Sequence, residues 1–550
     1  MKRIIPTIML FLTFISCSTD NVNDIETQEK EIILNISNST KRIDNTNIGV
    51  ISIKEAPSIN PNEKTPSFSK TNSDDIASDI PLTLIAEVSA PTYKGNTLRA
   101  THVDVDNNYV YVSYNVEGSK YLGGIDVINI SDPTKPVVEL EAILPNTDVS
   151  SVKYFKEKLY LAGASSSYDI DESNPAILMS VELSNGLPTE NFNLIDLSSY
   201  VATDVFASDK GIFSVSGDNG DLSKFNLYSN ELEYKVPLED LRAIGGYKNQ
   251  IFALSGTNGL FIYNENNLKL INTFSTSNNI AESKRTIDFF DNNVLVAEGK
   301  DGLGIYNISS GNKSSSISLP EIKDSNIDLN EVVTNSVTVT NNHVFMANGA
   351  AGLAVHDLEN GIHDITKTGT LDIDGSTNYV KSTDDYIFVA SGDGGLKIIK
   401  IIESDNNGTS ISCTDLPTYK GSSWLNINSN DPKSYGGSLS LNGLNINDDF
   451  TFCGSLAISK GLNINSGGNF YMSGSLAQGS VYNKWNSFNI NNKATLFIEG
   501  SLVVYGNMIL NDGATIEFVG SGSSITVYGD VIKNGTVTIK GDYTDTFNKL

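Results

Sequence analysis

The residue types best suited to metal binding or nucleophilic catalysis are few in this chain and lack the spacings that such chemistry needs. The 550 residues include four histidines and three cysteines. No HxH, HExxH or CxxC pattern occurs, which argues against a zinc site. Neither a GxSxG elbow nor a phosphate-binding glycine loop before a helix is present. His356 stands where other copies of a repeat have tyrosine, so we expect it to pack. We therefore predict that the protein is not an enzyme and carries no cofactor.

Pairs of acidic residues occur in several turn-like segments and could bind Ca²⁺ through carboxylate oxygens. None has the full spacing of a calcium-binding loop, so solvated turns are the favoured interpretation and bound Ca²⁺ is the alternative. A carboxylate pair for glycoside cleavage also stays open, because its members meet only in three dimensions. The pairs are Asp104 with Asp106, Asp169 with Asp171, Asp218 with Asp221, and Asp372 with Asp374.

The strongly acidic balance of the chain limits the partners it can bind. Its net charge is −27 at pH 7. Such a surface repels the phosphate backbone of DNA and RNA, so we expect no nucleic-acid partner. The simplest interpretation of the charge is solubility.

The strands that must position these side chains are predicted by a β-rich sequence segment that repeats along the chain. Two β-rich runs flank a glycine-centred turn, as in IFALSGTNGLFIYN and VLVAEGKDGLGIYN, and copies start at 110, 159, 212, 251, 294, 344 and 387. A repeat of this length built only from strands is typical of propeller blades. We predict a seven-bladed β-propeller, in which residues 82–89 supply the outer strand of the last blade and close the ring. Six or eight blades are the alternatives, because the second and third copies are irregular.

The repeats resemble those of the LVIVD-repeat β-propeller family. The resemblance rests on GGIDVINISDPTKP at 123–136 and on shorter GLxIYN or GLxVHD segments at Gly259, Gly302 and Gly352. It covers roughly residues 83–402. It implies the fold and brings no shared catalytic residues.

The segment after residue 404 follows a different pattern. Gly-Ser-Leu recurs at 437, 454, 474 and 500, between very short strands that are separated by Gly or Asn turns. Such strands without helices predict a β-solenoid-like domain, with a small β-sandwich as the alternative. Cys413 and Cys453 are an even pair here, so we predict a disulfide between them. Trp424 and Trp485 are candidate contacts for a glycan or a partner protein, although packing is the favoured interpretation.

The N-terminus resembles a bacterial lipoprotein signal. Lys2 and Arg3 precede a short apolar run that ends at Cys17. The resemblance implies lipidation of Cys17, and the acidic residues that follow resemble the surface-export signal of Bacteroidota lipoproteins. It thus implies an outer membrane anchor with the protein facing outward, a location that permits a disulfide.

The sequence predicts four segments and one favoured function. The segments are a signal peptide at 1–16, a lipidated cysteine and flexible tether at 17–80, an all-β propeller at 81–403, and the solenoid-like domain at 404–550. Two apolar runs in the tether, IILNI and IGVISI, could pair as strands. We expect a lipid-anchored surface scaffold that binds protein partners through propeller loops, as an accessory subunit of an outer-membrane complex. The alternatives are a glycan-binding or adhesive protein and, after that, a polysaccharide-active enzyme.

Overall fold

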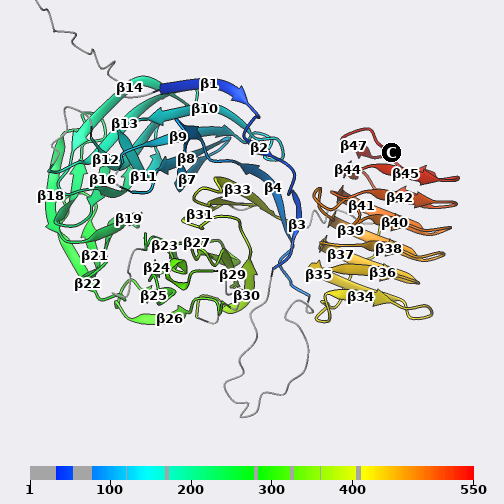
Figure 1. Cartoon of the computed structure of the whole chain (residues 1–550). Coiled ribbons are helices and arrows are strands. Elements are labelled where there is room, and N and C mark those ends of the chain that lie inside the picture. The colour runs from blue at the N-terminus through cyan, green and yellow to red at the C-terminus, as the bar shows by residue number, and fades with distance from the viewer. Residues whose placement is uncertain are drawn as a thin grey trace, which may run out of the picture.

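The computed structural model describes residues 33–53, 77–118, 120–166, 173–277, 283–322, 327–358, 361–363, 365–383, 385–403 and 410–550. These residues form a ring of β-sheets and, beside it, a stack of short strands (Figure 1). The predicted signal segment 1–16 and Cys17 lie outside the described residues. No helix in the described part of the chain has the length and apolar composition of a membrane span.

Seven antiparallel sheets form the ring, which confirms the predicted seven-bladed propeller. Each of the first six blades follows the chain order from its first strand to its fourth. Their strands are β7 (Arg99–Asp106), β8 (Tyr109–Asn115), β9 (Gly123–Asn129) and β10 (Val137–Leu144); β11 (Thr147–Tyr154), β12 (Lys158–Ser165), β13 (Ala176–Ser184) and β14 (Leu187–Asp196); β15 (Ala202–Ser208), β16 (Gly211–Ser216), β17 (Gly220–Phe225) and β18 (Leu232–Leu238); β19 (Leu241–Tyr247), β20 (Gln250–Ser255), β21 (Gly259–Asn264) and β22 (Leu270–Phe274); β23 (Ile287–Phe290), β24 (Asn293–Ala297), β25 (Leu303–Asn307) and β26 (Lys313–Ile317); and β27 (Ser336–Val339), β28 (His343–Ala347), β29 (Leu353–Asp357) and β30 (Thr366–Leu371).

The seventh blade joins the two ends of the propeller sequence. It consists of β31 (Tyr379–Ser382), β32 (Tyr386–Ala390), β33 (Leu396–Ile401) and β4 (Leu82–Val88). β4 pairs antiparallel with β33, so that Val88 lies opposite Leu396 and Leu82 opposite Ile401. This confirms the predicted closure, and it removes the edge that an open ring would expose.

Residues 33–53 belong to the propeller, so the predicted tether was too long. β1 (Ile33–Ser39) extends blade 1 by pairing with β10, while β2 (Ile43–Asp44) and β3 (Gly49–Ile51) both pair with β4. The two apolar runs thus add to different blades instead of pairing with each other. The physical reason is burial, because Ile48 and Val50 are only 2% and 7% exposed.

Buried aspartates link neighbouring blades. Asp104 accepts hydrogen bonds from the Lys153 ammonium and the Tyr154 backbone N–H, each at 2.8 Å. In the same way Asp204 accepts from the Ile244 N–H at 3.0 Å, and Asp288 accepts from the Val339 N–H at 2.9 Å. Each bond connects the first strand of one blade to that of the next. A buried carboxylate requires such partners, so these bonds fix how the blades meet.

The C-terminal domain is a β-solenoid of parallel strands, so the sandwich alternative was wrong. One sheet contains β34 (Trp424–Ile427), β36 (Gly443–Ile446), β38 (Leu462–Ile464), β40 (Phe488–Ile490), β42 (Met508–Asn511) and β45 (Val531–Asn534); the other contains β35 (Lys433–Leu441), β37 (Asp449–Ile458), β39 (Asn469–Gln478), β41 (Thr495–Val504), β43 (Thr515–Phe518), β44 (Ser524–Val527), β46 (Thr538–Lys540) and β47 (Thr544–Asp545).

Identical residues stack from one coil of the solenoid to the next. Gly454, Gly474 and Gly500 align in register with φ of 139°, 121° and 126°. A Cβ at Gly454 would lie 2.0 Å from a carbonyl oxygen of the preceding coil, so glycine is required at this bend. Inside, Phe450 and Phe470 stack with ring centroids 5.3 Å apart. The same in-register pairing repeats along the rod and makes its core continuous.

A strap of chain crosses one sheet of the solenoid before the first coil. Glu499 accepts hydrogen bonds from the backbone N–H groups of Ser410 and Ile411, at 3.0 and 3.1 Å. Cys413 and Cys453, which we predicted to be paired, form a disulfide with their Cα atoms 5.8 Å apart. The disulfide therefore fastens the entering chain to the second coil.

The N-terminal segment also joins the propeller to the solenoid. The Val50 N–H donates to the Gly479 carbonyl, and the Val481 N–H donates to the Ile48 carbonyl, both at 2.9 Å. Ile48 and Val50 pack in one apolar cluster with Ala457 and other solenoid residues. β3 and β4 accordingly lie between the ring and the stack in Figure 1.

Candidate functional site

A polar cavity of about 1310 Å³ lies at the centre of the propeller. Its lining comes from the starts of the first strands of the blades and from the turns between second and third strands. Because strands alternate in direction within a blade, these segments lie on one face of the ring. The connections from one blade to the next also begin and end on that face, whereas the opposite face carries short turns such as 107–108 and 248–249. No solenoid residue lines the cavity.

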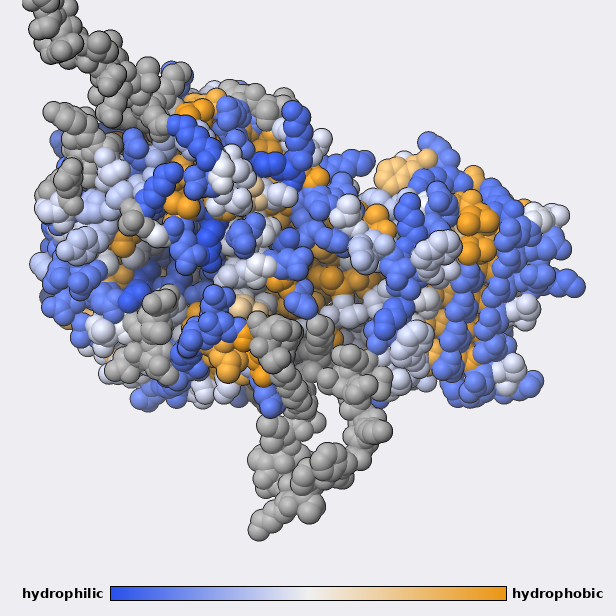
Figure 2. Space-filling model, viewed as in Figure 1, coloured by the Kyte–Doolittle hydropathy of each residue, from blue (hydrophilic) through white to orange (hydrophobic). Residues whose placement is uncertain are grey.

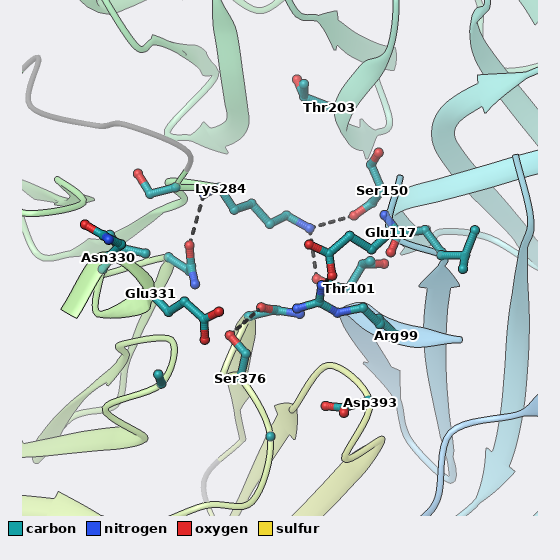
Figure 3. Close-up of a pocket in the computed structure, with 18 of the residues that line it drawn as sticks. Arg99, Thr101, Glu117, Ser150, Thr203, Lys284, Asn330, Glu331, Ser376 and Asp393 are labelled. Carbon is teal, nitrogen blue, oxygen red and sulfur yellow. Dashed lines mark hydrogen bonds and ion pairs between the residues drawn. The ribbon is translucent and has the colours of Figure 1, made fainter. Parts of the chain in front are cut away.

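Lys284 lines this cavity and extends across the centre of the ring (Figure 3). It precedes blade 5, and its ammonium donates to the carbonyl oxygens of Thr101 in blade 1 and Ser150 in blade 2, at 3.0 and 2.6 Å. Desolvation lowers the pKa of Lys284 to about 8, while the nearby Asp204 carboxylate opposes this change. The side chain therefore ties three blades together across the channel.

The cavity carries charges of both signs. Arg99 pairs with Glu117, and Arg242 pairs with Asp240 at 2.6 Å. Lys300 donates to the carbonyl oxygens of Asn330 at 3.0 Å and Val332 at 3.3 Å. The other acidic lining residues are Asp328, Glu331 and Asp393. The positive and negative side chains that line the cavity balance one another. The cavity therefore suits a polar partner surface more than a highly charged ion.

Two exposed apolar side chains stand near the cavity on the same face. Leu329 lies in the 3-10 turn η2 (Leu329–Glu331) and is 63% exposed, and Tyr200 in the connection between blades 2 and 3 is 66% exposed. The turn is held by its N-cap Asp328, which accepts from the Asn330 N–H at 2.8 Å, and by Lys300. Leu329 is thus presented by an ordered turn.

The acidic pairs that could bind Ca²⁺ lie in different environments in the described residues. No group of three His, Cys, Asp or Glu side chains comes together there. Asp104 is 4% exposed in β7 and links blades instead of facing solvent, and Asp221 in β17 pairs with Lys235 at 2.9 Å. Asp169 and Asp171 lie outside the described residues. For Asp104, then, the solvated-turn interpretation was wrong, because it lies in a buried strand.

The histidines are dispersed over the propeller. His102 stacks on Tyr379 with ring centroids 3.7 Å apart, which joins blade 1 to blade 7. Burial, and then the positive charge of Lys284, hold the pKa of His102 well below its usual value, so the ring is neutral at pH 7. His356 is 1% exposed, in agreement with the packing position expected from the sequence.

Trp485 does not follow the packing interpretation, because most of its side chain is exposed, whereas Trp424 packs at the rim of the solenoid against Gly443. Trp485 is 89% exposed and Trp424 is 42% exposed. Trp485 lies in the connection 479–487, together with Tyr482, which is 80% exposed. The corresponding turn one coil earlier, at 459–461, is much shorter. The Gly-Ser-Leu copies at 454, 474 and 500 are unevenly spaced, and the longer interval between 474 and 500 is the sequence signal of this insertion.

Comparison with known proteins gives similarities of fold. No family model matches the chain, and no curated protein matches it. Among solved structures, the WD40 β-propeller domain of Doa1 is 14% identical over 57% of this chain and 96% of that chain, with a TM-score of 0.40. U3-55K is 9% identical over 57% and 98% of the two chains, with a TM-score of 0.43. The RRP9 WD40 repeats are 10% identical over 59% and 99%, with a TM-score of 0.42. Because these scores are low, the assignment of seven blades rests on the strand pairing, and the LVIVD resemblance stays a prediction.

Proposed function

We propose that the chain is a non-enzymatic interaction scaffold, anchored by a lipid on Cys17 to the outer membrane, whose propeller binds a protein partner. The observation that carries the proposal is the difference between the two faces of the ring. One face has the cavity and the exposed Leu329 and Tyr200, whereas the opposite face has short turns. Rigid repeats that present variable loops on one face commonly use that face for binding.

The surroundings of the cavity suit a protein partner. Apolar side chains on ordered backbone are frequent centres of protein interfaces, while charges at the rim steer association and fix register. Leu329 and Tyr200 would supply the apolar contacts, and the mixed charges of the cavity would accept polar side chains of a projecting loop. The solenoid lies beside the ring (Figure 1), and none of its described residues lines the cavity.

The anchor fits the position where the described chain begins. β1 starts at Ile33 on the outer edge of blade 1, so the segment from Cys17 to Ile33 reaches at most roughly 55 Å when fully extended. A lipid on Cys17 would therefore hold the propeller close to the membrane. The partner would accordingly be an outer-membrane protein or a protein assembled with one, with this chain as its accessory subunit.

Affinity purification from detergent-solubilised outer membrane tests the proposal. The full chain should recover a defined partner, and Leu329→Asp combined with Tyr200→Asp should abolish its recovery. Tyr228→Asp is the matched control, because Tyr228 is 81% exposed but lies in a turn on the opposite face. Recovery of the free chain alone, or equal loss with the control, would contradict the proposal. Cys17→Ser should release the protein from the membrane and abolish labelling with a fatty-acid analogue.

A further inference from the structure

A corner of the solenoid has a charge opposite to that of the whole protein. Residues 418–427, 442–446, 459–464 and 478–490 meet there on successive coils, and they contain three lysines and no aspartate or glutamate. The lysines, Lys420, Lys460 and Lys484, are all exposed. In a chain with a net charge of −27, this segregation marks a local basic surface. We call Trp424, Trp485, Tyr482 and the three lysines the basic aromatic corner.

The aromatic rings of this corner differ in how much of their surface is exposed. Trp485 and Tyr482 are among the most exposed large side chains of the described residues. Trp424 lies flat against the solenoid wall, where a Cβ on Gly443 would come within 2.3 Å of its ring. The Lys460 ammonium lies 5.6 Å from the Trp424 ring centroid. β34 and β40 are three coils apart, so the two tryptophans are separated by roughly 14 Å along the rod.

Hydrogen bonds hold the corner in a defined shape. The Gln478 side-chain amide donates to the carbonyl oxygens of Lys460 at 2.5 Å and Asn486 at 2.7 Å, which joins the Trp485 connection to the preceding coil. The same connection is bonded to the propeller through Gly479 and Val481. The backbone that carries Trp485 and Lys460 is therefore fixed, so a ligand would not have to order this connection on binding.

A row of side-chain amides runs beside the corner. Asn445 donates to Asn426 at 2.8 Å, Asn463 to Asn445 at 2.8 Å, and Asn489 to Asn463 at 2.7 Å. Each amide carries a second N–H that this ladder does not use. The result is a repeated row of hydrogen-bonding groups at the spacing of the coils.

We propose that the basic aromatic corner binds an anionic polysaccharide. Sugar rings stack on Trp485 and Tyr482 and contact the exposed part of Trp424, the lysines pair with carboxylate or sulfate groups, and the amide row binds hydroxyl groups. A surface that repeats along one axis matches a polymer of repeated units better than the compact, irregular surface of a folded protein. This site is separate from the cavity face of the propeller, so the inference does not depend on the function proposed above.

Binding of the full mature chain to polygalacturonate and to chondroitin sulfate, measured by calorimetry, tests the inference and separates carboxylate from sulfate recognition. Affinity should fall as salt is added, because salt screens the lysine charges. Lys460→Ala with Lys484→Ala should weaken binding about tenfold, since each exposed ion pair contributes modestly. Trp485→Ala should weaken it by about the same factor through lost stacking.

Two control variants test whether polysaccharide binding depends on the basic aromatic corner. Lys210→Ala removes an exposed lysine of the propeller, and Tyr228→Ala removes an exposed aromatic ring there, so neither should change the affinity. Circular dichroism should show the same fold for every variant. The inference would be overturned if neither polymer bound at low salt or if neutral dextran bound equally well. It would also be overturned if polyglutamate competed equally or if the corner variants kept the wild-type affinity.

Discussion

The propeller and the solenoid are both β-repeat structures, but they join their repeats in different ways. In the propeller, apolar clusters pack between neighbouring blades, and buried polar groups add directed contacts, as Asp204 does with Ile244 and Lys284 does across the ring. In the solenoid, apolar residues stack in register and asparagine amides form ladders. The difference follows from geometry, because blades are tilted around an axis while coils are related by simple translation. A ring needs specific contacts that close it, whereas a rod repeats the same contact.

The same difference organises the candidate sites. The ring gathers side chains from many distant parts of the chain around one cavity, which has charges of both signs. The rod places neighbouring coils side by side and produces a linear surface of one charge. Figure 2 shows that the visible face of both regions is mostly hydrophilic, with smaller apolar patches between the hydrophilic residues.

The largest effect is expected from breaking the closure of the ring. Leu82 is fully buried in β4, and Leu82→Asp places a carboxylate without a partner there. We expect a loss of more than about 3 kcal/mol of propeller stability. Hydrogen exchange should rise in residues 81–403 and change little in the outer coils of the solenoid. Leu232→Asp, at a position 53% exposed, is the control. Equal loss of protection in both regions would show that they unfold as one unit.

Removal of the disulfide should act on the solenoid alone. Cys413→Ser with Cys453→Ser opens a link between residues 40 positions apart and should cost about 2–4 kcal/mol. Thermal unfolding followed by hydrogen exchange should show the loss after residue 410. A reductant should destabilise the wild-type protein similarly and leave the double variant unchanged. A loss centred on the propeller would contradict the assignment of the strap to the solenoid.

Lys284, whose side chain crosses the ring, should make the stability of the propeller depend on pH. The pKa of Lys284 is lowered from 10.5 to about 8, so between these values the unfolded chain binds more protons than the folded one. The contribution of Lys284 to stability therefore rises above pH 8 and is lost as the pH falls through 8. Relative to Lys284→Met, the wild-type protein should gain about 1–2 kcal/mol between pH 7.5 and 9.5. Denaturant unfolding measures this difference, and Lys210→Met should show none.

The smallest effect is expected from one rung of an amide ladder. Asn463 donates to Asn445 and accepts from Asn489. Asn463→Ala removes both bonds at a half-buried position and should cost about 1 kcal/mol of solenoid stability. Asn492→Ala, an exposed asparagine outside the ladder, is the control in the same denaturant titration. A cost equal to that of opening the disulfide would mean that the ladder, and not the apolar stack, holds the rod together.

Local patterns in the sequence were sufficient to predict much of the fold. The period of the repeated β-rich segment predicted seven blades, and the apolar segment at 82–89 predicted the closing strand. Residues 33–53 were misassigned because short apolar runs within a polar segment do not show which distant edge they will join. The solvated environment expected for Asp104 was wrong, because the sequence does not show that Lys153 of the next blade lies beside this carboxylate and allows its burial.

The candidate sites were less accessible to sequence reasoning. Trp424 and Trp485 were singled out as contacts, but their exposure depended on how the coils turn. The sequence does not distinguish Lys460 and Lys484 from other lysines, because only the stacking of the coils brings them to one corner. Lys284 contacts Thr101 and Ser150, which lie far away in sequence.

The amino-acid sequence by itself determined the strands, the number of repeats, the pairing of Cys413 with Cys453 and the change from propeller to solenoid. These features depend on short-range spacing, because alternation, glycine turns and repeat length act within or between adjacent strands. Only the tertiary structure decided which loops share the cavity, that Lys284 spans the ring, and that lysines and tryptophans meet on one corner of an acidic protein. Those features depend on contacts between residues that are distant in sequence, and such contacts exist only after the ring has closed and the coils have stacked.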